Sequence, residues 1–240
     1  MLRTSRLRQA SVVTAGAVVA SLLAHASPAH AAPGANAAAA HRNAQTCANS
    51  DMVYRPRSAF PNTSAGLARY ALQANQIRSA VLCLVNAQRT SRNLTALSSN
   101  NALYSAARGH VMAAVSLKWW GKVAPGKNCR PLQNDPTTCD PHINPQTGST
   151  IEGRVRASGY LTGCRSYNYA ENTYTGWGTA RVTPRAAVTW WMGSPGHRAA
   201  ILNPVFRETG IAVARGSADP AAGSTTPAAA YVQLFGNCVR

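Results

Sequence analysis

The first 31 residues constrain the fold most, because they decide the redox compartment in which the rest of the chain folds. Arg3, Arg6 and Arg8 form a positive region without an acidic residue, and residues 10–26 are uncharged and rich in Ala, Val and Leu. Ala29-His30-Ala31 then supplies the small residues that a signal peptidase site requires. The pattern predicts a secretory signal that is cleaved after this triplet, and hence a secreted, extracellular protein.

An uncleaved membrane anchor is the alternative interpretation of this stretch. A spanning helix needs about 20 mostly apolar residues, whereas this stretch is shorter, diluted by alanine and followed by Ser27-Pro28. We therefore favour cleavage, and we expect no transmembrane segment in the mature chain.

Six cysteines remain after cleavage: Cys47, Cys83, Cys129, Cys139, Cys164 and Cys238. In an exported chain an even number of cysteines predicts disulfides, although six cysteines allow 15 pairings and the sequence does not fix which of them forms. We favour Cys47–Cys83, Cys129–Cys139 and Cys164–Cys238. No C-x-x-C pair occurs, which disfavours a zinc ribbon or a thioredoxin-like redox centre.

Cleavage leaves 240 − 31 = 209 residues, a length that suits one domain with a sizeable core. We expect a disordered Ala-rich lead over residues 32–46, an N-terminal extension with the start of the first helix over 47–77, and the main domain over 78–240. We also expect a monomer.

Apolar residues at helical spacing predict several helices. The first lies within Leu67–Arg89, the second follows an N-cap at Ser99-Asn100, a short one spans Ile151–Ala157, and another begins at Pro184. Between them, residues 119–149 form a long polar stretch that we expect to be a loop.

The later apolar runs are short, β-branched or aromatic and bounded by Gly, which predicts strands. These are Thr209–Ala214, Ala230–Phe235 and, with a weaker pattern, Tyr167–Asn172. Helices on both sides of a small antiparallel sheet would make an α+β protein with a three-layer α-β-α sandwich.

The charge of the chain is strongly positive, with 24 Lys and Arg against seven Asp and Glu, or +17. Loss of three arginines with the signal leaves 17 − 3 = +14. Such a field attracts anionic wall polymers and lipid headgroups. The basic residues are scattered rather than clustered, so we expect no specific nucleic-acid partner.

Few residues have a pattern that predicts chemistry. The chain has no H-E-x-x-H motif, no G-x-S-x-G elbow and no Gly-rich phosphate loop. Ser194 precedes Pro195 and is better explained as a helix N-cap than as a nucleophile. Three residues remain as candidates, His142, Glu171 and His197, because two imidazoles and a carboxylate could form an open site for a divalent metal such as Zn²⁺ or Mg²⁺.

The order of short motifs in this chain resembles the CAP superfamily, which comprises cysteine-rich secretory proteins, antigen 5 and pathogenesis-related-one proteins, in its bacterial SCP-like branch. The similar segments cover about residues 78–236. They are Leu84-Val85-Asn86-Ala87-Gln88-Arg89, Ala106-Ala107-x-x-His110-x-Met112, His142, Gly159-Tyr160, Ala170-Glu171-Asn172, Trp191-Met192-x-Ser194-Pro195-Gly196-His197-Arg198, Thr209-Gly210-Ile211 and Tyr231-Val232-Gln233-Leu234-Phe235-Gly236.

The resemblance implies an α-β-α sandwich with a cleft that holds two histidines and two acidic residues. His142, Glu171 and His197 match three of these positions, whereas the fourth falls near Ser194, where the chain has no acid. Cys47 and Cys83 resemble the extra pair of the N-terminal extension in bacterial members.

Three interpretations of the cleft triad compete: a structural hydrogen-bond network, a metal-binding site, and a catalytic site. Because no nucleophile or second acid supports catalysis, we favour a non-catalytic extracellular binding module with a lipid, a sterol or an anionic cell-wall polymer as partner. A metal-dependent extracellular hydrolase, either a peptidase or an esterase, is the alternative.

Overall fold

The computed structural model describes residues 46–123 and 128–240. The predicted signal and all but the last residue of the Ala-rich lead lie outside the described residues. The helices are α2 (Ser64–Thr90), α3 (Asn101–Leu117), α4 (Ile151–Ala157), α5 (Pro184–Gly193) and α6 (Pro195–Leu202), with short 3-10 turns η1 (Arg57–Ala59), η2 (Thr179–Arg181) and η3 (Pro220–Ala222). The strands are β1 (Ser98–Ser99), β2 (Gly121–Lys122), β3 (Pro131–Leu132), β4 (Asp135–Cys139), β5 (Ser166–Trp177), β6 (Glu208–Arg215) and β7 (Ala228–Val239).

The main sheet has four strands in the order β1-β6-β7-β5. β7 pairs antiparallel with both β5 and β6, and the short β1 lies parallel to β6 at the other edge. The register pairs Glu171 with Leu234 and Ser166 with Val239, so β5 and β7 match over their full lengths. β5 is thus an edge strand, and the polar residues that it carries lie at the margin of the sheet.

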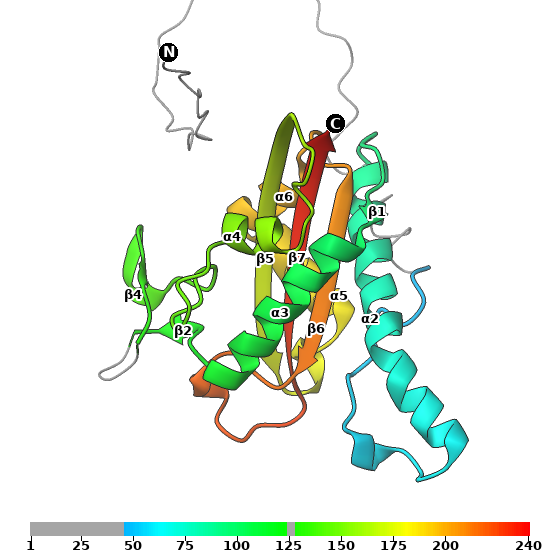
Figure 1. The fold of residues 1–240 in the computed structure, drawn as a ribbon. Coiled ribbons are helices and arrows are strands. Elements are labelled where there is room, and N and C mark those ends of the chain that lie inside the picture. Colours follow the sequence, from blue (N-terminus) through cyan, green and yellow to red (C-terminus); the bar gives the residue numbers. More distant parts are fainter. Residues whose placement is uncertain (1–45, 124–127) are drawn as a thin grey trace, which may run out of the picture. The chain divides into compact units, whose positions relative to one another are not determined.

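Helices cover both faces of this sheet (Figure 1), with α3 and α4 against one face and α2, α5 and α6 against the other. Alternation along the strands separates the two cores, because successive side chains point to opposite faces. Ala212 and Val232 pack toward α3, whereas Ile211 and Tyr231 pack toward α2 and α5. The three-layer α-β-α sandwich and the α+β class are therefore confirmed.

The predicted helix starts are confirmed by their caps. The side chain of Asn100 accepts hydrogen bonds from the backbone N–H groups of Ala102 and Leu103 at the start of α3. Thr183 caps α5, which begins at Pro184, and Thr150 caps α4. Each cap satisfies N–H groups that have no partner within the helix.

The long polar stretch differs from the predicted loop, because it contains a second sheet of three short strands in the order β2-β4-β3. The Cys129–Cys139 disulfide closes it. Trp119 is 1% exposed and donates a hydrogen bond from its indole Nε1 to the carbonyl oxygen of Asp140, 3.1 Å away. The strands are too short to leave a period-2 pattern, so only the tertiary contacts reveal them.

All three favoured disulfides are present, with Cys47–Cys83 and Cys164–Cys238 joining the other two pairs. Cys47–Cys83 fixes the N-terminal extension to α2. Arg185 of α5 holds the same extension through two hydrogen bonds to the carboxylate of Asp51, at 2.8 and 2.9 Å. The extension is thus attached to the domain by both a covalent and an ionic link.

Arg89 explains why the first helix carries an arginine near its end. Its side chain is fully buried and donates hydrogen bonds to the carbonyl oxygens of Thr95, Ile201, Asn203 and Phe206. A single guanidinium therefore fixes the end of α2 to the segment that joins α6 to β6.

Candidate functional site

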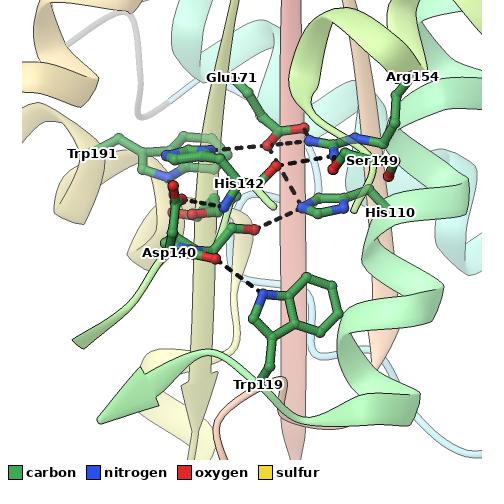
Figure 2. Close-up of polar contacts among 10 residues, drawn as sticks. His110, Trp119, Asp140, His142, Ser149, Arg154, Glu171 and Trp191 are labelled. Atoms are coloured by element: carbon green, nitrogen blue, oxygen red, sulfur yellow. Dashed lines mark hydrogen bonds and ion pairs between the residues drawn. The ribbon is translucent and has the colours of Figure 1, made fainter. Parts of the chain in front are cut away.

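Glu171 is the centre of the candidate site and lies on the edge strand β5, facing α3 and α4 (Figure 2). Its side chain is fully buried. Both carboxylate oxygens accept hydrogen bonds from Nη2 of Arg154 on α4, at 2.9 and 2.8 Å. A buried carboxylate requires such a partner, because an unpaired charge in the interior is strongly unfavourable.

Two histidines complete the surroundings of Glu171. Nδ1 of His142, in the loop before α4, lies 2.9 Å from Oε1, and Nε2 of His110, on α3, lies 3.6 Å from the same oxygen. His110 is 1% exposed, whereas the side chain of His142 is 28% exposed. Glu171 therefore contacts one guanidinium and two imidazoles.

The acceptors around these histidines indicate where each ring carries its proton. Nε2 of His110 lies 2.8 Å from the carbonyl oxygen of Pro141, which can only accept, so Nε2 is the protonated nitrogen. By the same argument His142 donates from Nδ1 to the carboxylate of Glu171. In the tautomer with the proton on Nδ1, the lone pair of His142 is on Nε2, which is the nitrogen that faces a ligand.

Arg154 and Asp140 hold the loop that carries His142. Nη1 of Arg154 donates to the carbonyl oxygens of His142 and Ser149, at 3.0 and 2.9 Å. The carboxylate of Asp140 accepts a hydrogen bond from the backbone N–H of His142. Arg154 thus joins β5 to this loop, and the structural interpretation of the cleft accounts for every one of these contacts.

His197 has a different environment from the other predicted site residues. Its Nδ1 lies 2.8 Å from Oγ of Ser194, and its ring packs edge-on against Trp190, with centroids 4.8 Å apart. Its carbonyl oxygen accepts a hydrogen bond from Asn172, the neighbour of Glu171 on β5. This bond ties the start of α6 to β5 through the residue that follows Glu171.

The environment lowers the pKa of His110 and of His197. Burial lowers the pKa of His110 to about 4, against the smaller opposing effect of Glu171. Burial, followed by the charge of His142, lowers the pKa of His197 to about 4. The rings of His110 and His197 are therefore neutral at pH 7.

The pKa of Glu171 shifts downward despite its burial. Burial alone would raise it, but the His110 imidazole, the hydrogen bond from His142 and the charge of Arg154 together lower the pKa to about 2. Glu171 is therefore a carboxylate at every physiological pH, and it cannot serve as a proton donor.

The donor set gives little support to a three-ligand metal site. In the described segments, no group of three or more His, Cys, Asp or Glu side chains is arranged to hold a metal ion. Both oxygens of Glu171 are engaged by Arg154, whose positive charge would also repel a cation. A site that uses all three predicted residues stays a prediction, and it would require Arg154 to release Glu171.

The structure brings together only part of the predicted triad. His142 and Glu171 are in contact, whereas His197 bonds to Ser194 and forms no hydrogen bond or ion pair with either of them among the described residues. Ser194 stands at the start of α6 as predicted, but its hydroxyl bonds to the imidazole and makes no capping bond. The sequence pattern does not mark His110 or Arg154 as site residues, although both contact Glu171.

Comparison with known proteins places the chain in a family. The family model described as "Cysteine-rich secretory protein family" (CAP) matches residues 82–235. A comparison with curated proteins found no match. No helix in the described ranges is both long and apolar enough to cross a bilayer.

Several solved structures are similar to the chain. An extracellular protein of Bacillus anthracis with an SCP domain has 20% identity and a TM-score of 0.49 over 73% of this chain and 44% of that protein. An outer surface protein of Borrelia burgdorferi has 19% identity and a TM-score of 0.42, over 66% and 90%. A cysteine-rich secretory protein of Staphylococcus aureus has 18% identity and a TM-score of 0.42, over 68% and 38%.

The chain thus spans less than half the length of the Bacillus protein. The family match covers most of the elements described above, from residue 82 within α2 to residue 235 within β7. Three disulfides are consistent with an extracellular protein of this kind. The chain therefore belongs to the cysteine-rich secretory protein (CAP) family.

Proposed function

We propose that the chain is a secreted, non-catalytic binding module for an anionic ligand of the cell envelope. The observation that carries this proposal is the complete engagement of Glu171 by Arg154 and His142. The only carboxylate of the predicted triad is thereby part of the scaffold, and the site keeps one half-buried imidazole with an available nitrogen.

A hydrolase needs more than this arrangement offers. A metal-assisted or general-base mechanism requires a group that can take up a proton within reach of a bound water. Glu171 is fully buried with a pKa of about 2, and it has no oxygen free of the guanidinium. His142 alone would have to act as the base, without an acid positioned to assist it.

The ligand class follows from charge. The chain carries 24 basic and seven acidic residues, so anionic groups are attracted to it over a large part of its surface. Anionic wall polymers and anionic lipids fit this field, whereas it contributes nothing to the affinity for a neutral sterol.

The experiment compares binding with turnover on the purified mature protein. We expect retention on immobilised teichoic-type polymer or on anionic lipid, and no hydrolysis of peptide and ester substrates with or without Zn²⁺. If the parent hydrolyses a substrate and a folded His142→Ala protein does not, the hydrolase alternative replaces this proposal. The matched His197→Ala protein tests the second imidazole in the same way.

If the site binds a metal ion, the imidazoles of His142 and His197 are the side chains that would coordinate it. Nδ1 of His142 donates to Glu171, and Nδ1 of His197 bonds to the Ser194 hydroxyl, so each ring is oriented by Nδ1. In the tautomer in which His197 also donates from Nδ1, both rings offer Nε2 to a metal ion. Imidazole nitrogens suit Zn²⁺, whereas Mg²⁺ prefers oxygen ligands. We therefore propose Zn²⁺ rather than Mg²⁺ as the ion that would bind there.

Melting curves test this assignment. At about 100-fold over its dissociation constant, Zn²⁺ should stabilise the parent by about 2.7 kcal/mol relative to chelator. Mg²⁺ and Ca²⁺ should have no effect, and the His142→Ala/His197→Ala protein should not respond to Zn²⁺. An equal response of parent and variant would mean that the ion binds elsewhere.

A further inference from the structure

A cavity unconnected with the His/Glu cluster lies at the end of the sheet where β6 turns toward β7. It has a volume of about 710 Å³, whereas the cavity beside His110 and Arg154 has about 300 Å³. Four parts of the chain line it: residues 53–56 of the N-terminal extension, the end of α3, Thr179 of η2, and the connection between β6 and β7 with the adjoining strand ends. Ligand cavities typically have about 300–1,000 Å³, so this one is large enough for an organic ligand.

The walls of this cavity are mainly apolar. Val53 and Pro56 line it from the extension, Val115 from α3, and Pro227 with Ala228 from the start of β7. Gly216 allows the β6–β7 connection to lie close to α3, because a Cβ at position 216 would be 2.7 Å from Cγ1 of Val115. The cavity therefore offers a surface suited to a hydrocarbon chain.

The charged residues that line this cavity are all basic. Arg55, Lys118 and Arg215 line it and are exposed, and none of the residues that line it is acidic. Their side chains form no ion pair within the described part of the chain. An unpaired cation beside an apolar wall complements a ligand with an anionic head and an apolar tail.

We propose that this cavity binds a single-chain anionic amphiphile, with its tail against Val53, Val115 and Pro227 and its carboxylate or phosphate at Lys118 and Arg215. The inference rests on the proposed function, since it names the chemistry and the place of one anionic ligand. A wall polymer lacks the apolar part and would leave these walls in contact with water.

The test uses laurate as the probe, below the concentration at which it forms micelles, and isothermal titration calorimetry. The parent should bind laurate and dodecyl phosphate, and should not bind the dodecyltrimethylammonium cation of the same chain length. Lys118→Asn/Arg215→Gln should weaken laurate binding about tenfold or more, given the usual strength of charge-assisted contacts. Asn suits position 118 because the backbone there has φ +51°, a region that Asn tolerates.

Two further proteins separate the cavity from general charge attraction. Ser224→Trp introduces an indole at the exposed rim of the cavity and should also abolish binding. Arg130→Gln/Arg165→Gln removes the same charge from exposed positions away from the cavity and should bind laurate as the parent does.

The outcomes are distinguishable from failure of the proposed function. No laurate binding by the parent, or equal weakening in both charge variants, overturns the cavity proposal. Binding to anionic vesicles without binding to free laurate also overturns it, in favour of a membrane surface. If retention on the wall polymer persists in these cases, the proposed function stands without this cavity.

Discussion

Glu171 and Arg154 form an ion pair whose two members depend on each other. Both are buried, at 6% and 9% exposure, and the two hydrogen bonds of 2.8 and 2.9 Å compensate the removal of both charges from water. The pair also positions His142, whose ring and carbonyl oxygen each bond to one member.

Removing one member should therefore be more costly than removing both. We expect Arg154→Met to lower the free energy of unfolding by about 3–5 kcal/mol, because it leaves the Glu171 charge buried and unpaired. Arg154→Met/Glu171→Gln should recover part of this loss. Urea unfolding measures both, with Arg165→Met as a control at an exposed position. If the double variant is less stable than Arg154→Met, the two side chains do not form a coupled pair.

The buried titratable groups predict how stability depends on pH. The pKa of His110 falls from 6.5 to about 4 on folding, so the unfolded chain binds more protons between these values. The free energy of unfolding therefore does not depend on this group above pH 6.5. As the pH falls from 6.5 to 4, protonation of His110 in the unfolded chain lowers the free energy of unfolding by ~3 kcal/mol. The pKa of Glu171 falls from 4.5 to about 2, so its contribution is lost below pH 4.5.

Urea unfolding from pH 8 to pH 3 tests this dependence. Stability should decrease in two steps, the first between pH 6.5 and 4 and the second below pH 4.5. In His110→Gln the first step should become smaller, while His197 contributes the remainder. A His110→Gln protein with the parent's dependence in this range would contradict the assignment.

Part of the site could be predicted from the sequence and part could not. Glu171 attracts notice because acids are few in this chain, and His142 because it follows the second-helix segment in a motif order that resembles the family. Arg154 is one of many arginines, and His110 falls on the apolar face of α3, where a histidine looks like a core residue. Only the packing of α3 and α4 against β5 shows that both contact one carboxylate.

At the scale of elements, α3 lies directly against β6 where the helix crosses the strand. A Cβ at Gly210 would lie 2.1 Å from backbone atoms of Leu103 and Tyr104. The helix and the strand can be this close only because position 210 has no side chain. Gly210 thus determines the distance between α3 and the sheet, and with it the position of His110.

Gly210→Ala should therefore force α3 away from the sheet. We expect a loss of about 3 kcal/mol or more in the free energy of unfolding, at the upper end of overpacking costs. Gly109→Ala is the matched control, because that glycine is exposed within α3 and nothing lies within 4 Å of an added Cβ. The control should gain up to about 1 kcal/mol from helix propensity. Equal effects of the two substitutions in thermal unfolding would refute the close contact.

The elements themselves follow from local patterns where those patterns are long. α4 has the predicted bounds, Ile151–Ala157, and β6 extends the predicted strand by one residue at each end, whereas β7 (Ala228–Val239) is twice as long as the predicted Ala230–Phe235. β5 runs to Trp177, well beyond the predicted Asn172, because pairing with β7 continues through residues that lack an apolar alternation. Strands of two residues, such as β2 and β3, exist only through their partners.

At the scale of the whole molecule, the excess of positive charge predicts a salt-dependent retention on anionic surfaces. The Debye length falls from about 10 Å at 0.1 M salt to about 3 Å at 1 M, so retention on teichoic-type polymer should be lost over this range. Elution from the immobilised polymer at stepped salt concentrations measures it. His142→Ala/His197→Ala should elute with the parent, since the interaction depends on distributed charge. Retention that persists at 1 M salt would instead indicate a specific, desolvated contact.

The central position of β7 has a consequence for the order of events when the chain is made. β5 and β6 do not pair with each other, and each needs residues 228–239 as its neighbour. While the chain emerges from its N-terminal side, the sheet therefore lacks its middle strand until residues 228–239 have been made. Until that point β5 and β6 have no strand between them, and the sheet cannot hold the helices of its two faces in place.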